Sequence, residues 1–357
     1  MIPSFAFFGH PKAVGCYLQP TAFYTGGLQH HKLWQPRHDL SLIHILIKGA
    51  DFFVEGSSSV AKLLRVPSLI IGLTVVAFGT SMPELAVSVT AAVQGSNEIA
   101  ISNVIGSNIF NLLMVVGVSA LVKPMQVQPP VLKKEFPFSI FVGIVLLFLC
   151  SDQWIFQWFG IVAEQNVLSR LDGGILLLLF ALFMYGILRD AGKARKEHSA
   201  REEEDEIQIM PPAKSILYII GGLAGIVIGG QLVVSSATEI AREFGLSETL
   251  IGLTIVAIGT SLPELVTSVV AAVKGECEIA LGNVVGSNVF NVLMVLGLSI
   301  TISPIRVEMT AVYDLFILAV VSLLILVFLF WKKRVPRYAG AMMVSVYAAY
   351  TAYIILR

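Results

Sequence analysis

A stretch of 53 residues occurs twice in this chain. Residues 72–124 recur as residues 252–304, shifted by 180 positions without a gap, and 33 of the 53 positions are identical. Each copy carries a polar string inside apolar sequence, Gly79–Glu84 in the first and Gly259–Glu264 in the second. A glutamate in the apolar middle of a membrane helix is costly, so its duplication indicates a function. The repeat constrains the fold to two related halves.

The composition is that of a protein that crosses a lipid bilayer many times. Only 13% of the 357 residues are charged and 56% are hydrophobic, whereas soluble proteins have about 25% charged residues. The formal net charge is zero, which argues against a nucleic-acid partner because that partner requires a basic patch. The three cysteines are scattered and odd in number, so neither a disulfide framework nor a zinc site is indicated.

Ten membrane spans are predicted from runs of about 20 apolar residues. The clear ones lie near 68–93, 98–122, 136–152, 172–189, 214–236, 248–273, 278–302, 312–331 and 338–356. A weaker and shorter first span lies near 41–60. The polar segment 190–213 separates five spans from five. We therefore predict an all-α integral membrane fold with one five-helix repeat over 46–189 and another over 214–357.

The placement of lysine and arginine gives the orientation. Basic residues gather after spans 1, 3, 5 and 9, whereas the alternate connections hold only Arg170, Arg242 and Arg306. The segment 190–213 is therefore predicted to be a charged cytoplasmic loop, with both termini outside. Because five spans is an odd number, the second half enters the membrane opposite to the first. Inverted repeats are typical of secondary transporters, whose site lies at the midplane between the halves.

The first 45 residues do not fit the repeat. The shift of 180 aligns residues 229–233 with 49–53, but upstream Leu217–Gly221 falls opposite Arg37–Ser41. Residues 1–40 are too polar to cross a bilayer, and they lack the basic start and apolar core of a signal peptide. Either the first helix is shortened, or residues 1–45 are a non-native or disordered start; we prefer the second interpretation.

The first polar string predicts an oxygen-rich helix face. Thr80, Glu84 and Ser88 are spaced i, i+4, i+8 and share one face. Pro83 has no N–H to give and opens the turn at Gly79, which frees a carbonyl that needs a partner at membrane depth. The second copy has the same elements at Gly259, Thr260, Pro263, Glu264 and Ser268.

Each copy also holds another polar string that begins Gly-Ser-Asn, Gly106–Asn111 in the first copy and Gly286–Asn291 in the second, and it adds neutral oxygens to this set. Asn103, Ser107 and Asn111 share a helix face, as do Asn283, Ser287 and Asn291. An all-oxygen set suits hard cations such as Ca²⁺ and Na⁺ and disfavours zinc and copper. Two buried glutamates cannot both stay ionised without a counter-charge. One Ca²⁺ supplies it, and Na⁺ or protons replace it otherwise, so the pattern predicts antiport with no cofactor.

Two other classes of function are disfavoured. An intramembrane enzyme that used the two glutamates as an acid/base pair would need a nucleophile, and the spans hold no Ser/His or Cys/His set. A channel does not need two equivalent gates, whereas alternating access does. We therefore predict a transporter, not an enzyme.

The strings resemble the α-repeats of the cation/calcium exchanger superfamily, in its prokaryotic sodium/calcium exchanger branch, over about residues 47–357. The resemblance implies an antiporter in a prokaryotic inner membrane that is functional as a monomer, moves Ca²⁺ outward against Na⁺, and slides spans 1 and 6 across the others. It implies Glu84 and Glu264 as Ca²⁺ ligands. The further ligands that it implies are the carbonyls of Ala77 and Ala257 and the oxygens of Thr80, Ser81, Ser107, Asn111, Thr260, Ser261, Ser287 and Asn291.

The chain departs from the family pattern at two places. Some members have aspartate where this chain has Asn291, so one group that could carry a charge or a proton is absent here. The coupling ion therefore stays open between Na⁺ and H⁺. The other departure is the first span, which is incomplete if the chain starts as written.

Overall fold

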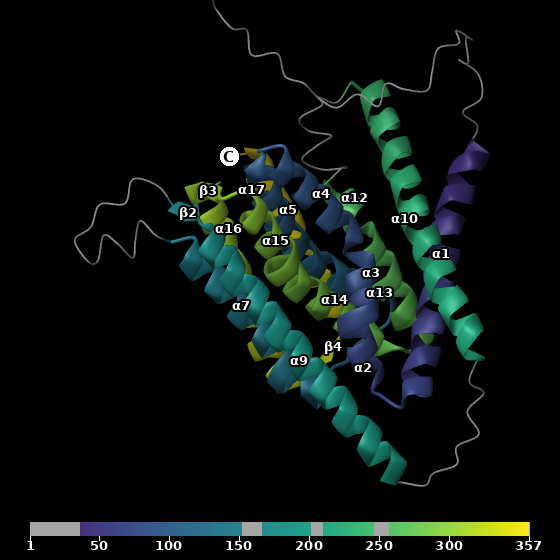
Figure 1. The fold of residues 1–357 in the computed structure, drawn as a ribbon. Coiled ribbons are helices and arrows are strands. Elements are labelled where there is room, and N and C mark those ends of the chain that lie inside the picture. Colours follow the sequence, from purple (N-terminus) through teal and green to yellow (C-terminus); the bar gives the residue numbers. More distant parts are fainter. Residues whose placement is uncertain (1–35, 152–165, 201–209, 246–256, 357) are drawn as a thin grey trace, which may run out of the picture.

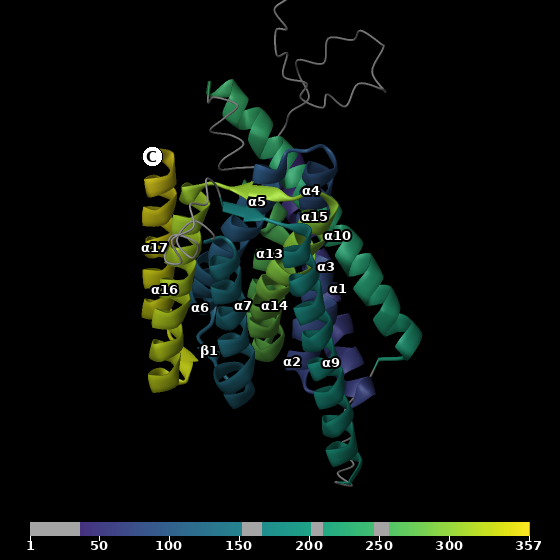
Figure 2. The ribbon, with the colours of Figure 1, turned by 60° about the vertical axis from the view of Figure 1, so that its left-hand side comes forward.

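The computed structural model describes residues 36–151, 166–200, 210–245 and 257–356, and most of them are helical. Long helices form a bundle around α14 (Cys277–Phe290), in which every residue from Ile279 to Phe290 is buried (Figures 1 and 2). The first half comprises α1 (Pro36–Leu64), α2 (Ser68–Ile71), η1 (Gly72–Val76), α3 (Ala77–Thr80), α4 (Met82–Val93), α5 (Asn97–Phe110), η2 (Asn111–Val115), α6 (Val116–Val122), η3 (Val131–Glu135), α7 (Phe136–Leu149) and α9 (Arg170–Ala200). The second half comprises α10 (Pro212–Glu243), α12 (Ala257–Thr260), α13 (Leu262–Lys274), α14, η5 (Asn291–Leu296), α15 (Gly297–Ile302), α16 (Met309–Lys332) and α17 (Arg337–Leu356). The segments η1, η2, η3 and η5 are π-helical turns inside longer helices.

Six helices of the described part are long and apolar enough to cross a membrane, or seven if a bent pair counts as one span. They are Glu98–Val122, Arg170–Lys196, Pro212–Glu243, Cys277–Ile302, Met309–Lys332 and Arg337–Leu356, with Ser68–Thr80 plus Met82–Val93 as the bent pair. All seven coincide with predicted spans. The other three predicted spans correspond to α1, α7 and α13, which are helices that do not meet this criterion in the described residues.

Two predicted boundaries move in the structure. Helix α9 continues to Ala200, so residues 190–200 of the predicted loop are helical. The span was predicted from its apolar run, but lysine, arginine and glutamate are also good helix formers and extend it into water. Helix α1 begins at Pro36, so residues 36–45 are helical as well. Residues 1–35 lie outside the described part, and the prediction for them stays a prediction.

Helices α1 and α10 pack against each other along most of their length and run obliquely beside the rest of the bundle (Figures 1 and 2). Their approach depends on glycine. A Cβ atom at Gly222 would lie 2.5 Å from the Phe53 backbone nitrogen, and one at Gly49 would lie 2.8 Å from the Ile226 nitrogen. Small residues allow such close backbone contact between membrane helices. The two helices therefore form one tightly packed pair.

Two short antiparallel strand pairs join the connections between helices. Strand β1 (Met125–Gln126) pairs with β4 (Arg334–Val335), and β2 (Asn166–Leu168) pairs with β3 (Ile305–Val307). The first pair joins two connections that are predicted to be cytoplasmic, and the second joins two that are predicted to be outside. Each strand pair therefore places its two connections at the same end of the bundle, and which end is cytoplasmic stays a prediction.

Candidate cation site

The glutamate-bearing helix is broken just before each glutamate. Ser81 separates α3 from α4 with φ −86° and ψ 9°, and the two segments meet at a bend of 48°. Ser261 separates α12 from α13 with φ −93° and ψ 6°. A break here is the effect expected of the prolines, which stand in the first turn of each following helix and give no N–H. Thr80 and Glu84 consequently lie on opposite sides of the break.

Each glutamate is held by a serine of the other repeat. Glu84 and Glu264 are both 0% exposed. The Ser261 hydroxyl donates to Glu84 Oε1 at 3.0 Å and lies 3.1 Å from the Ser107 hydroxyl, while the Ser81 hydroxyl donates to Glu264 Oε1 at 2.7 Å. The Oε2 atom of each glutamate has no hydrogen-bond partner among the described residues. A buried carboxylate oxygen without a partner is costly unless a cation meets it.

The surroundings of each glutamate are called a half-site here, and the half-site of Glu264 contains more of the predicted oxygens than that of Glu84. The Ser287 hydroxyl lies 3.3 Å from Glu264 Oε1, 3.5 Å from the Ala77 carbonyl and 3.5 Å from the Thr80 hydroxyl. The Thr80 hydroxyl is itself 3.4 Å from the Ala77 carbonyl. Hydroxyl, carbonyl and carboxylate oxygens therefore converge here as the sequence predicts.

Asn111 and Asn291 occupy the same place in the two repeats, as the first residue of η2 and of η5. Both are 0% exposed. The Asn291 amide donates to Asn108 Oδ1 at 3.3 Å, whereas its own Oδ1 has no partner in the described part of the chain. Neither polar side-chain atom of Asn111 has such a partner. Single π-helical turns inside α-helices are frequent at functional sites.

The remaining two predicted residues stand at the ends of a short helix. Ala257 begins α12, and Thr260 ends it with a half-buried side chain. Together the twelve predicted residues fall on the two broken helices and on the two helices that carry the Gly-Ser-Asn strings. The groups of three or more His, Cys, Asp or Glu that hold many metals are not found among the described residues. Among the twelve predicted residues, Glu84 and Glu264 are the two that carry a carboxylate.

Four asparagines outside the predicted ligand set contribute to this region. The Asn108 and Asn288 amides each donate to the backbone carbonyl of the other, at 3.2 and 3.3 Å, and so tie α5 to α14. The amides of Asn103 and Asn283 hold the glutamate-bearing helices. The signal that points to all four is their duplication at a spacing of 180 residues.

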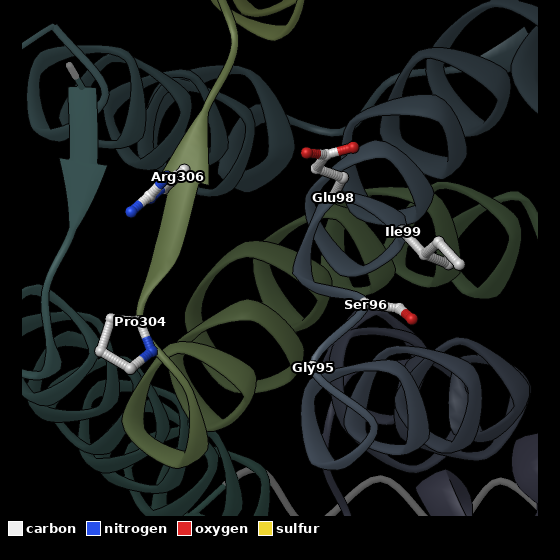
Figure 3. A pocket seen from close by; sticks show the side chains of 6 residues that line it. All are labelled: Gly95, Ser96, Glu98, Ile99, Pro304 and Arg306. Carbon is white, nitrogen blue, oxygen red and sulfur yellow. The ribbon is translucent and has the colours of Figure 1, made fainter. Parts of the chain in front are cut away.

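A surface pocket of the described residues lies elsewhere. It has a volume of about 530 Å³ and is lined by Gly95, Ser96, Glu98, Ile99, Pro304 and Arg306. Figure 3 shows Glu98 of α5 and Arg306 of β3 on its two sides. None of these residues belongs to the predicted site. Because Glu84 and Glu264 have no exposed surface, an ion can exchange with them only when the surrounding helices move.

The chain is similar to known transporters over most of its length. The family model described as sodium/calcium exchanger protein matches residues 40–189 and 214–356. The putative antiporter CaxA of Alkalimonas amylolytica is 38% identical over 313 residues, which cover 86% of this chain and 94% of that protein. The sodium/calcium exchanger MaX1 of Methanosarcina acetivorans is 34% identical over 328 residues, covering 85% and 94%. The inner membrane protein YrbG of Escherichia coli is 35% identical over 294 residues, covering 81% and 86%.

The fold is also that of a solved exchanger. The sodium-calcium exchanger NCX_Mj, in crystals soaked with Na⁺ and no Ca²⁺, superposes with a TM-score of 0.74 at 30% sequence identity, covering 88% of this chain and 97% of that one. The same exchanger soaked with Na⁺ and Sr²⁺ gives a TM-score of 0.73. With the matched family model and these relatives, the chain belongs to the sodium/calcium exchanger protein family, whose members are cation/Ca²⁺ exchangers of membranes.

Proposed function

We propose that this chain is a secondary-active antiporter that exchanges Ca²⁺ for Na⁺ by alternating access and normally moves Ca²⁺ outward. The observation that carries the proposal is the pair of buried glutamates, Glu84 and Glu264. The serine that holds each carboxylate stands three residues before the other glutamate, so the two carboxylates lie close together. Their combined charge is matched by one Ca²⁺ or by two Na⁺, which makes the two loads interchangeable.

The proposed ligands are the twelve residues predicted from the sequence. Glu84 Oε2 and Glu264 Oε2 are the central ones, because each is buried and has no partner among the described residues. The unpartnered Oδ1 atoms of Asn111 and Asn291 add neutral oxygens. The other proposed ligands are the oxygens of Ala77, Thr80, Ser81, Ser107, Ala257, Thr260, Ser261 and Ser287.

The proposed architecture is ten helices in two inverted five-helix repeats, with the site between the halves. Two observations support it. The half-sites repeat the same contacts, Ser261 to Glu84 and Ser81 to Glu264. Strand β1 of the first repeat corresponds to β3 of the second repeat, 180 residues later. Strand β1 pairs with β4 of the second repeat, and β3 pairs with β2 of the first, so each strand pairs with a connection of the other repeat. The resemblance to YrbG, which is named an inner membrane protein, supports a prokaryotic inner membrane, where we propose that one copy suffices for transport.

The coupling ion is tested in vesicles that contain the purified protein. We expect a Na⁺ gradient to drive Ca²⁺ uptake and a pH gradient alone to drive little, with the membrane potential clamped in both cases. The reason is that the neutral amide of Asn291 neither binds nor releases a proton in transport, and that a relative matched over 94% of its own length is named a sodium/calcium exchanger. Uptake at full rate from the pH gradient alone would replace Na⁺ by H⁺, since buried glutamates also accept protons. Protein-free vesicles are the control.

A further inference from the structure

One asparagine in each repeat clamps the helix that carries the glutamate. The Asn283 amide donates to the Ser268 hydroxyl at 3.0 Å and reaches the Glu264 backbone carbonyl at 3.4 Å. Asn103 makes the same two contacts to the counterpart groups of α4, at the same two distances. The contact to the glutamate carbonyl fixes the backbone from which the carboxylate projects.

Asn283 also reaches across to the other repeat. The Thr80 hydroxyl donates to Asn283 Oδ1 at 3.0 Å, and both residues are 0% exposed. The Asn283 side chain therefore uses its NH₂ group on α13 and its oxygen on α3. Because the Thr80 hydroxyl donates its hydrogen bond to the asparagine, the lone pairs of its oxygen can face a cation. One side chain thus links the Glu264 backbone of one half to a hydroxyl of the other.

We propose that Asn283 and Asn103 are positioning residues for ion exchange: they hold the glutamate backbone in place, and Asn283 also orients the Thr80 hydroxyl. This inference rests on the proposed function. It assigns Asn283 no contact with the ion itself. Its loss therefore weakens binding by misplacing the groups that bind, not by removing a ligand.

The test is a double-mutant cycle of Asn283→Leu and Thr80→Val. Each single variant is expected to raise the KM for Ca²⁺ about tenfold, as loss of one buried hydrogen bond does. The double variant is expected to raise it by clearly less than the product of the two single changes, because the two residues share one contact. Asn283→Asp keeps the acceptor for Thr80 and should recover part of the KM. Ser299→Ala is the control, because among the described residues the buried Ser299 hydroxyl bonds only to the Val295 carbonyl, one turn earlier in the same membrane span.

Two results would overturn the assignment. One is a fold-increase in KM for the double variant that equals the product of the two single fold-increases, which would mean that the residues act separately. The other is an unchanged KM in Asn283→Leu with less folded protein, which would mark a purely structural residue. Wild-type vesicles without Na⁺-driven uptake would instead contradict the proposed function, so the two failures are distinguishable.

A second, independent observation concerns one end of α1. Lys274, at the end of α13, has its Nζ 2.7 Å from Asp51 Oδ1 and 3.5 Å from Glu55 Oε2. It also donates to the Asp51 carbonyl at 3.3 Å. One turn further along α1, the Ser58 hydroxyl donates to Glu276 Oε1 at 2.6 Å. These contacts tie α1 to the turn between α13 and α14.

The repeat shows that the opposite end is built differently. The counterparts of Asp51 and Glu55 are Gln231 and Ser235 of α10, and the counterparts of Lys274 and Glu276 are Gln94 and Ser96. These four residues carry no charge, so they cannot form the ion pairs. In an inverted repeat, the contacts that close the site at one end of the bundle have counterparts of similar backbone structure at the other end. Here the side chains of the two sets of contacts differ.

We infer that the contacts of Lys274 with Asp51 and Glu55 form a one-sided latch. The latch favours one conformation of the transporter, in which the pair of α1 and α10 lies closed against α13 and α14. The closed end is the one that the basic residues place in the cytoplasm. This inference, too, rests on alternating access. The side chains of Lys274 and Asp51 are each 29% exposed, so solvent screens the pair and its effect is modest, about two- to fivefold in the equilibrium.

The latch is tested by comparing the KM for Ca²⁺ at the two faces, in right-side-out and inverted vesicles. Lys274→Gln introduces the residue of its counterpart and should lower the KM at the cytoplasmic face relative to the other about two- to fivefold, because fewer molecules are held closed there. The paired change Gln94→Lys with Gln231→Asp, in the Lys274→Gln background, should shift the ratio the opposite way. An unchanged ratio in both variants would overturn the latch. The ratio is measurable with either coupling ion, so this test is separate from that of the exchange itself.

Discussion

Replacing Glu84 or Glu264 by glutamine is expected to lower Na⁺-driven Ca²⁺ uptake by at least about a hundredfold. Each change removes one of the two charges that balance Ca²⁺. One charge pair at about 4 Å is worth about 4 kcal/mol at an effective dielectric constant of about 20, which corresponds to about a thousandfold in affinity. The amide oxygen of glutamine can still accept from Ser261 or Ser81. We therefore expect the amount of folded protein to stay the same, and initial uptake rates are the measurement.

The matched control is Glu98→Gln, which changes the same residue type at an exposed position. Glu98 lies at the start of α5 beside the surface pocket (Figure 3), and we expect its replacement to leave uptake unchanged. Normal uptake in both the Glu84 and the Glu264 variant would remove these residues from the site. If a variant loses uptake and also loses its single monodisperse peak in size-exclusion chromatography, the residue has a role in folding instead.

The sequence predicted the helices well because membrane insertion leaves few alternatives. A backbone in lipid must satisfy its own hydrogen bonds, so an apolar run of about 20 residues becomes a helix. Its polar ends are less constrained, which is why the reach of α9 to Ala200 was not predicted. Pro83 predicted a break, because its missing N–H acts locally. The size of the bend depends on the packed neighbours and was not predictable.

The candidate site was predictable in its composition but not in its pairing. The duplicated strings indicated two carboxylates among neutral oxygens, yet helical spacing relates only residues on one helix. That Ser261 holds Glu84 and Ser81 holds Glu264 is a contact between the halves, which depends on how the repeats pack. Asn283 was missed as a positioning residue for the same reason, since its Thr80 contact also crosses between repeats.

Replacing Gly222 by leucine is expected to separate α1 from α10 and to abolish transport. A Cβ atom at this position would lie 2.5 Å from the Phe53 nitrogen and 2.7 Å from the Gly49 carbonyl oxygen. Both are backbone atoms, so no side chain can rotate away and the whole helix has to move. Overpacking of this kind usually lowers the free energy of unfolding by about 1–3 kcal/mol. We expect a value near the upper end of this range, because the clash is with backbone atoms. We expect a lower midpoint of thermal unfolding in detergent, by several degrees, and uptake near the background.

The neighbouring Gly221 provides the matched control in the same turn of the same helix. Apart from its chain neighbours and the backbone of its own helix, no described atom lies within 4 Å of a Cβ atom placed there, and the residue is exposed. Gly221→Leu should therefore keep both the unfolding midpoint and the uptake rate. Gly222→Ala separates two explanations, because it adds only the clashing Cβ. If it impairs transport while the protein stays folded, the close approach of α1 and α10 is needed for movement of the pair. If Gly222→Leu and Gly221→Leu behave alike, the glycine contact does not hold the pair together, and a latch on α1 could not act on α10.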